Sequence, residues 1–120
     1  MESVLRDKSY LFALRIVKLY KHLVNQQKEY TLSKQVLRSG PSIGALVREA
    51  QYAQSVKDFG NTLSIALKEA NETESWMVLL NDAEYITKNI HDNIQHDISE
   101  LNKMVRVSIN TAKTSFKNWT

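Results

Sequence analysis

The sequence predicts an all-α protein that folds as an antiparallel four-helix bundle with a kinked second helix. The 120 residues contain one proline and three glycines, which leaves little material for turns. Apolar residues recur at the helical period of about 3.6 over long stretches. The segments between these stretches are short, as in helices that pack antiparallel around a shared core. We expect one domain over residues 1–120, because a chain of this length has no room for a second core.

The first helix is expected from about Ser3 to Lys28. Its apolar residues fall on two adjoining faces, so its apolar surface is unusually broad. One face carries Leu5, Phe12, Ile16, Tyr20 and Leu23, and the other carries Tyr10, Ala13, Leu14, Val17 and Val24. One neighbouring helix would not cover both faces, which predicts a further partner for this helix.

The second helix contains Gly40, Pro41 and Gly44 in the stretch SGPSIGALVREA. Its apolar register keeps the same phase on both sides of the proline. The register consists of Val36, Gly40, Ile43, Val47 and Ala50. We therefore expect one helix, kinked at Pro41, whose two glycines let another backbone approach closely. A phosphate-binding loop is disfavoured, because no strand precedes Gly40 and no lysine follows Gly44 in the required position.

Two helix starts carry capping signals. In the connection KEYTLSK, Thr31 or Ser33 is expected to accept backbone N–H groups as the N-cap of the second helix. Ser55, followed three residues later by Asp58, forms a variant of the capping box at the start of the third helix. The stretch TKNIHDN breaks the apolar period and is expected to separate the third helix from the fourth.

The third and fourth helices each have one long apolar stripe. In the third helix the stripe consists of Phe59, Leu63, Ala66, Ala70, Thr73, Met77 and Leu80. A second edge of this helix carries Ile65, Trp76 and Leu79, with Glu69 and Glu72 among them. In the fourth helix the stripe consists of Ile94, Ile98, Leu101, Val105, Ser108, Ala112 and Phe116. Stripes of this length are typical of amphipathic helices.

Few residues favour an enzyme. The chain has no cysteine, which excludes disulfides, thiol catalysis and thiolate metal sites. His91 and His96 are five residues apart, unlike a helical zinc pair, and no glutamate precedes a histidine by three residues, as in di-iron bundles. Glu69 and Glu72 form either a carboxylate pair for acid–base chemistry or, as we prefer, a contact with a neighbouring helix or subunit. We expect no enzymatic activity, no cofactor and no metal.

The composition predicts a globular protein of the cytoplasm. With 42% hydrophobic and 24% charged residues, the chain has the composition of an ordinary soluble globular protein and not of a disordered one. No apolar run approaches the roughly 20 residues of a membrane span, and the N-terminal segment lacks the features of a secretory signal. We therefore expect a cytoplasmic location and no membrane partner.

Basic residues collect in the first half of the chain and on two outward helix faces. Residues 1–60 contain ten lysines and arginines against five acidic residues, whereas residues 61–120 contain six against eight. The candidate nucleic-acid-binding residues are Lys8, Arg15, Lys18, Lys21, Lys103, Arg106, Lys113 and Lys117. In a single copy these faces are more simply interpreted as solvated surface. In a ring of subunits their fields add up and favour binding of RNA or DNA.

The stretch from Leu32 to Leu80 resembles a bacterial family of four-helix-bundle proteins, also called the S23 ribosomal protein family. The family was first named for proteins encoded in intervening sequences of large-subunit ribosomal RNA genes. The most specific parts of the resemblance are LRSGPSIGALVREA and SVKDFGNTLSIALKEANETESW. The resemblance implies a ring-shaped homopentamer and kinship with the accessory variability determinant proteins of diversity-generating retroelements, which bind nucleic acid and a reverse transcriptase. It implies no catalytic residues.

Two functions follow as hypotheses. The first is a non-enzymatic homopentamer that binds RNA or DNA through basic surfaces of the first and fourth helices. The second is a protein-interaction scaffold that docks a partner such as a reverse transcriptase and has no nucleic-acid affinity of its own.

Overall fold

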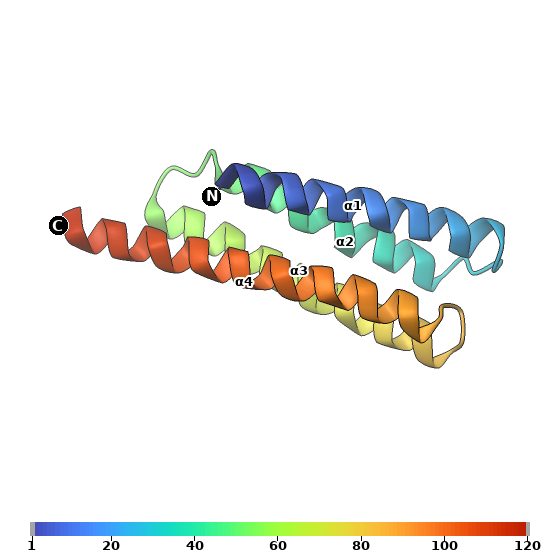
Figure 1. Cartoon of the computed structure of the whole chain (residues 1–120). Coiled ribbons are helices and arrows are strands. Elements are labelled where there is room, and N and C mark those ends of the chain that lie inside the picture. The colour runs from blue at the N-terminus through green and yellow to red at the C-terminus, as the bar shows by residue number, and fades with distance from the viewer. Residues whose placement is uncertain (1, 120) are drawn as a thin grey trace.

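Four α-helices make up the computed structural model, which describes the backbone of residues 2–119 and the side chains of residues 4–115. The helices are α1 (Glu2–Asn25), α2 (Leu32–Ala50), α3 (Val56–Asp82) and α4 (Lys88–Trp119), and the described residues contain no strand. Consecutive helices run antiparallel in a rod of 55 × 21 × 19 Å (Figure 1). The all-α prediction and the four predicted helices are confirmed.

The two ends of the rod hold different connections between the helices. Residues 51–55 connect α2 to α3 at the end where α1 begins and α4 finishes, and we call this the α2–α3 end (Figure 1). The other end holds the connections 26–31 and 83–87. The last turns of α4 extend past the rest of the bundle at the α2–α3 end, so the helices are not covered equally along their length (Figure 1).

The core consists largely of the residues that the helical periodicity predicts. All five members of the predicted α2 register, Gly40 included, and most of the α3 and α4 stripes are less than a tenth exposed. On α1, Leu5, Phe12, Ile16 and Leu23 are buried, but Tyr20 is only half-buried and Leu19 occupies the core instead. The side chain of Phe116 lies outside the described residues.

One side of α1 has no neighbour among the residues whose side chains the structure describes. Tyr10 is 63% exposed and Leu11 is 61% exposed, and Val4 and Leu14 are exposed beside them. Burial of large apolar side chains stabilises a protein by about 25 cal/mol per Å² of apolar surface, so an uncovered apolar face favours association. This exposure agrees with the expectation that one neighbouring helix does not cover both apolar faces of α1, and the further partner of this helix stays a prediction.

The glycines of α2 sit where this helix packs against α1. A Cβ atom added to Gly40 would lie 2.9 Å from Cγ1 of Ile16, and one added to Gly44 would lie 3.2 Å from the carbonyl oxygen of Ser9. A side chain at position 40 would need a shift of the Ile16 side chain, and one at position 44 would need the α1 backbone to move by a few tenths of an ångström, so α1 lies directly against both glycines. The helix continues through Pro41, as predicted, and the kink at this residue stays a prediction.

The first connection is capped by a residue that the sequence interpretation missed. Thr31 is the N-cap residue of α2 by position, as predicted, but its side chain makes no capping bond and Ser33 lies within α2, so the predicted side-chain cap is wrong. The buried carboxylate of Glu29 instead accepts the backbone N–H of Ser33 at 2.7 Å and that of Thr31 at 3.2 Å. The hydroxyl of Ser33 donates to the Glu29 carbonyl oxygen at 2.8 Å, which closes the motif.

The other helix boundaries confirm one prediction and correct two. Ser55 Oγ accepts the N–H of Asp58 at 2.9 Å, as in a capping box. The Asp58 carboxylate accepts the N–H of Gln54, one residue before the N-cap, at 3.1 Å, so the motif is the predicted variant of the capping box. The stretch TKNIHDN, residues 87–93, is expected from its sequence to precede the fourth helix, but all of it except Thr87 lies within α4, which begins at Lys88. Thr87 Oγ1 accepts the N–H of Ile90 and so caps this earlier start. The first helix ends at Asn25, three residues earlier than expected.

Candidate nucleic-acid interface

Two of the predicted basic residues on α1 are paired with carboxylates on α4. Arg15 Nη1 lies 2.6 Å from Asp97 Oδ2, and the Lys8 ammonium donates to Glu100 Oε1. The hydrogen bond from Lys8 lowers the pKa of Glu100, so this carboxyl is ionised at neutral pH and its charge offsets that of the lysine. The positive charge of Lys8 and Arg15 is therefore largely matched within the chain, although Coulomb attraction between such exposed groups is weak.

These four charged residues line a groove of about 310 Å³ between α1 and α4. Leu11, Phe12 and Leu101 form the apolar part of its lining. The groove thus has two basic groups on its α1 side and two acidic groups on its α4 side. With equal numbers of both charges, paired across the groove, it does not favour a polyanion over a polycation.

The remaining predicted cations are exposed and unpaired among the described side chains. They are Lys18 and Lys21 on α1 and Lys103, Arg106 and Lys113 on α4. The three residues of α4 follow one another at spacings of three and seven, which places them along one side of the helix. The side chain of Lys117 lies outside the described residues. We call Lys103, Arg106 and Lys113 the α4 stripe.

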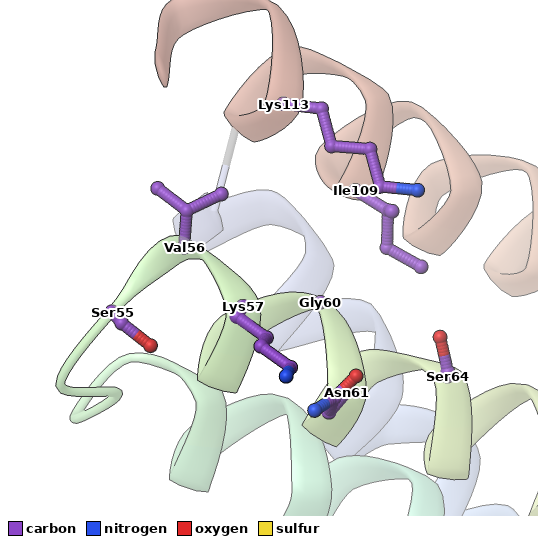
Figure 2. Close-up of a pocket in the computed structure, with 8 residues that line it drawn as sticks. All are labelled: Ser55, Val56, Lys57, Gly60, Asn61, Ser64, Ile109 and Lys113. Carbon is purple, nitrogen blue, oxygen red and sulfur yellow. The ribbon is translucent and has the colours of Figure 1, made fainter. Parts of the chain in front are cut away.

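The α4 stripe leads into a pocket at the α2–α3 end of the bundle. The pocket has a volume of about 430 Å³ and lies between the first turns of α3 and the last described turns of α4. Figure 2 shows Lys113 and Ile109 on α4 at one side of it and Lys57, Asn61 and Ser64 on α3 at the other. Lys57 was not among the predicted site residues, because no pattern in the sequence connects it to Lys113, 56 positions later.

The carboxylate pair on α3 is held by an arginine of α2. Arg38 donates one nitrogen to Glu72 and places the other 3.5 Å from Glu69 Oε1. The hydrogen bond from Arg38 lowers the pKa of Glu72, and the same pairing raises the pKa of Arg38. An ionised carboxylate with a lowered pKa is a weak general base at neutral pH. The preferred interpretation, a contact with a neighbouring helix, is confirmed.

The histidines form no recognisable metal site. His91 Nδ1 lies 3.1 Å from Asp92 Oδ1, and His96 is exposed one turn further along α4. Within the residues that the structure describes, no three histidine, cysteine, aspartate or glutamate side chains are grouped to hold a metal ion. None of the helices, over their described lengths, combines the length and hydrophobicity that a bilayer span requires.

Comparisons with known proteins agree with the bundle and point to one family. The sequence model of the family described as 23S rRNA-intervening sequence protein matches residues 2–107. The chain is also similar to a crystal structure from Bacteroides thetaiotaomicron VPI-5482, described as a protein with unknown function from the S23 ribosomal protein family. The two chains are 57% identical and superpose with a TM-score of 0.89, over 91% of this chain and 97% of the other. No protein with a curated description matches.

Proposed function

The chain belongs to the 23S rRNA-intervening sequence protein family, and from this premise we propose that it is a non-enzymatic homo-oligomer that binds RNA or DNA. The observation that carries the proposal is the α4 stripe, in which Lys103, Arg106 and Lys113 are exposed and make no ion pair with a described side chain. Lysine and arginine side chains that follow one side of a helix are suited to contact successive phosphates of a nucleic-acid backbone.

The interface that we propose relies more on the basic residues of α4, and less on those of α1, than the interface predicted from the sequence. Lys8 and Arg15 already have carboxylate partners, so the proposal gives more weight to α4. On α1, Lys18 and Lys21 are exposed and remain candidates. A carboxylate beside a cation repels phosphate and reduces the net attraction.

Association of several chains would strengthen the interaction. The uncovered side of α1, with Tyr10, Leu11 and Leu14, supports a contact between subunits. Five subunits in a ring are what the family resemblance implies, and such a ring would present the α4 stripe five times. The fields of repeated stripes add up, which raises both the local concentration of a polyanion and its rate of association. The cytoplasm is the location that this proposal assumes.

The proposal is tested by the salt dependence of binding. We expect a fluorescently labelled RNA or DNA oligonucleotide to bind more weakly as salt rises, with a log–log slope of about −0.7 per phosphate contact for a single strand. The variant Lys103→Glu/Arg106→Glu should bind at least about tenfold more weakly and lose about 1.4 from the magnitude of that slope. The control Lys34→Glu/Lys88→Glu makes the same charge change on exposed lysines at the other end of the bundle. Equal losses in both variants, or none in either, would contradict a role for the α4 stripe.

A second function is favoured by the same apolar side of α1. If the wild-type protein binds no nucleic acid and Tyr10, Leu11 and Leu14 are not buried between subunits, these exposed residues favour a scaffold that docks a protein, such as a reverse transcriptase. Mixing the two purified proteins and measuring the mass of the complex distinguishes this scaffold from a nucleic-acid binder.

A further inference from the structure

Gly60 occupies a position where nothing in the fold requires a glycine. A Cβ atom added to it would meet no atom within 4 Å, and the described glycines all have negative φ. Glycine in the interior of a helix is less favourable than alanine by about 0.5 to 1 kcal/mol. The other two glycines differ, because each has α1 directly against it. Neither packing nor backbone conformation accounts for Gly60.

The structural consequence of Gly60 is an open space beside it. This residue lines the pocket of about 430 Å³ between α3 and α4 (Figure 2). The eight lining residues are Ser55, Val56, Lys57, Gly60, Asn61, Ser64, Ile109 and Lys113. A larger side chain at position 60 would project into the pocket, since no other described atom lies within 4 Å of the position of its Cβ atom.

The lining combines groups that suit a ligand with an anionic part and a flat apolar part. Lys57 and Lys113 come from two different helices, and neither makes an ion pair with any side chain that the structure describes. None of the eight lining residues is acidic. Val56 and Ile109 supply apolar surface, and Asn61 supplies an amide with both donors and acceptors. A phosphate with an attached nucleobase has this combination of properties.

We propose that this pocket receives one unpaired nucleotide of a single-stranded nucleic acid. The phosphate lies between the ammonium groups of Lys57 and Lys113, and the base lies against Val56 and Ile109, where the Asn61 amide reaches its edge. The volume is within the range of about 300 to 1,000 Å³ that is usual for small-ligand pockets. A base inside a duplex cannot enter such a pocket, whereas an unstacked base of a single strand can.

This inference rests on the proposed function and adds a site to it. The α4 stripe supplies attraction that depends on charge alone, so it acts on single strands and duplexes alike. The pocket makes the protein distinguish single strands from duplexes, because only a base that is not paired with another base can enter it. Lys113 belongs to both features and joins them.

The pocket is tested by filling it without a change of charge. Gly60→Leu places a side chain in the open space, and the matched control Ser75→Leu adds the same side chain at an exposed position of α3 outside the pocket. We expect Gly60→Leu to weaken binding of a labelled 12-nucleotide single-stranded RNA at least about fivefold, with binding of a blunt duplex of the same sequence unchanged. Ser75→Leu should bind both RNAs as the wild type does.

A second variant, which removes the two positive charges of the pocket, tests the proposal if Gly60→Leu does not fold. Thermal unfolding followed by circular dichroism shows whether Gly60→Leu is folded. If it is not, Lys57→Gln/Lys113→Gln decides, and we expect it to weaken single-strand binding at least about tenfold, more than it weakens duplex binding. Lys34→Gln/Lys88→Gln, at the far end of the bundle, is its control.

The outcomes separate the pocket from the proposed function. If folded Gly60→Leu binds the single strand as tightly as the wild type, or loses single-strand and duplex affinity equally, the pocket proposal is overturned. If Lys103→Glu/Arg106→Glu still loses affinity in that case, nucleic-acid binding through the α4 stripe stands without the pocket. If the wild-type protein binds no RNA or DNA, both proposals are overturned.

Discussion

The hydroxyl oxygens of Thr73 on α3 and Ser39 on α2 lie 2.8 Å apart, and both side chains are fully buried. This hydrogen bond joins the two helices inside a largely apolar core. Arg38, the neighbour of Ser39 in the chain, holds Glu69 and Glu72 at the surface of the same pair of helices. Buried polar groups are tolerated only when they are paired, so this contact restricts how α2 and α3 can slide along each other.

Thr73→Val is expected to destabilise the bundle by about 1 to 2 kcal/mol, because it leaves the buried Ser39 hydroxyl without this partner. The double variant Ser39→Ala/Thr73→Val removes both hydroxyls and should be less destabilised than the two single variants added together. Urea unfolding of the four proteins measures the free energies. Strict additivity would show that the two hydroxyls do not interact.

Alanine is expected to have opposite effects at two glycines. Gly40→Ala forces a shift of Ile16 and should lower the free energy of unfolding by about 1 to 3 kcal/mol. Gly60→Ala meets open space and should raise that free energy by about 0.5 to 1 kcal/mol. Both variants are compared with the wild type by urea unfolding. A rise for Gly40→Ala would contradict the packing described for α1 against α2, and a fall for Gly60→Ala would contradict the open space described beside Gly60.

Glu29 is expected to make part of the stability depend on pH. Burial by itself would raise the pKa of this carboxyl, but the backbone N–H groups of Ser33, Leu32 and Thr31 together outweigh burial and lower the pKa below its ordinary value of 4.5. A lowered pKa in the folded state means that the stabilisation is fully present above about pH 4.5 and is lost as the pH falls through the folded-state value.

Glu29→Ala tests this cap directly. At neutral pH the variant should be less stable by about 1 kcal/mol, the usual effect of losing a helix cap. The difference from the wild type should shrink when unfolding is measured at pH 3, since the wild-type carboxyl is then increasingly protonated. A difference that is the same at both pH values would exclude the ionised carboxylate as the cause.

Asp97→Asn is expected to increase affinity for nucleic acid. The substitution removes one negative charge from the groove between α1 and α4 and releases Arg15 from its ion pair. Binding of a labelled oligonucleotide should strengthen several-fold at low salt and approach the wild-type value at high salt, where exposed charges are screened. Ser99→Ala, a neutral change at an exposed residue of the same helix, serves as control. Weaker binding by Asp97→Asn would contradict a phosphate-binding role for Arg15.

The sequence predicts what depends on local spacing and misses what depends on helix docking. The buried faces of α2 and α3 follow from periodicity, because neighbouring turns of one helix place those residues together whatever packs against them. The pairing of Lys8 with Glu100 joins residues 92 positions apart, and the shared pocket of Lys57 and Lys113 likewise exists only after α3 and α4 have docked. The Glu29 cap was missed because glutamate is not a usual capping residue. Here its side chain folds back from a turn in which Lys28 has a φ of 56°.

The most direct test of the account is the mass of the particle in solution, measured by light scattering coupled to size exclusion, with and without short RNA and DNA. The account predicts a particle with the mass of five chains that gains mass with nucleic acid at low salt and releases it at higher salt. A monomer at micromolar concentration whose mass does not change with nucleic acid would contradict both the association through α1 and the binding role of the α4 stripe.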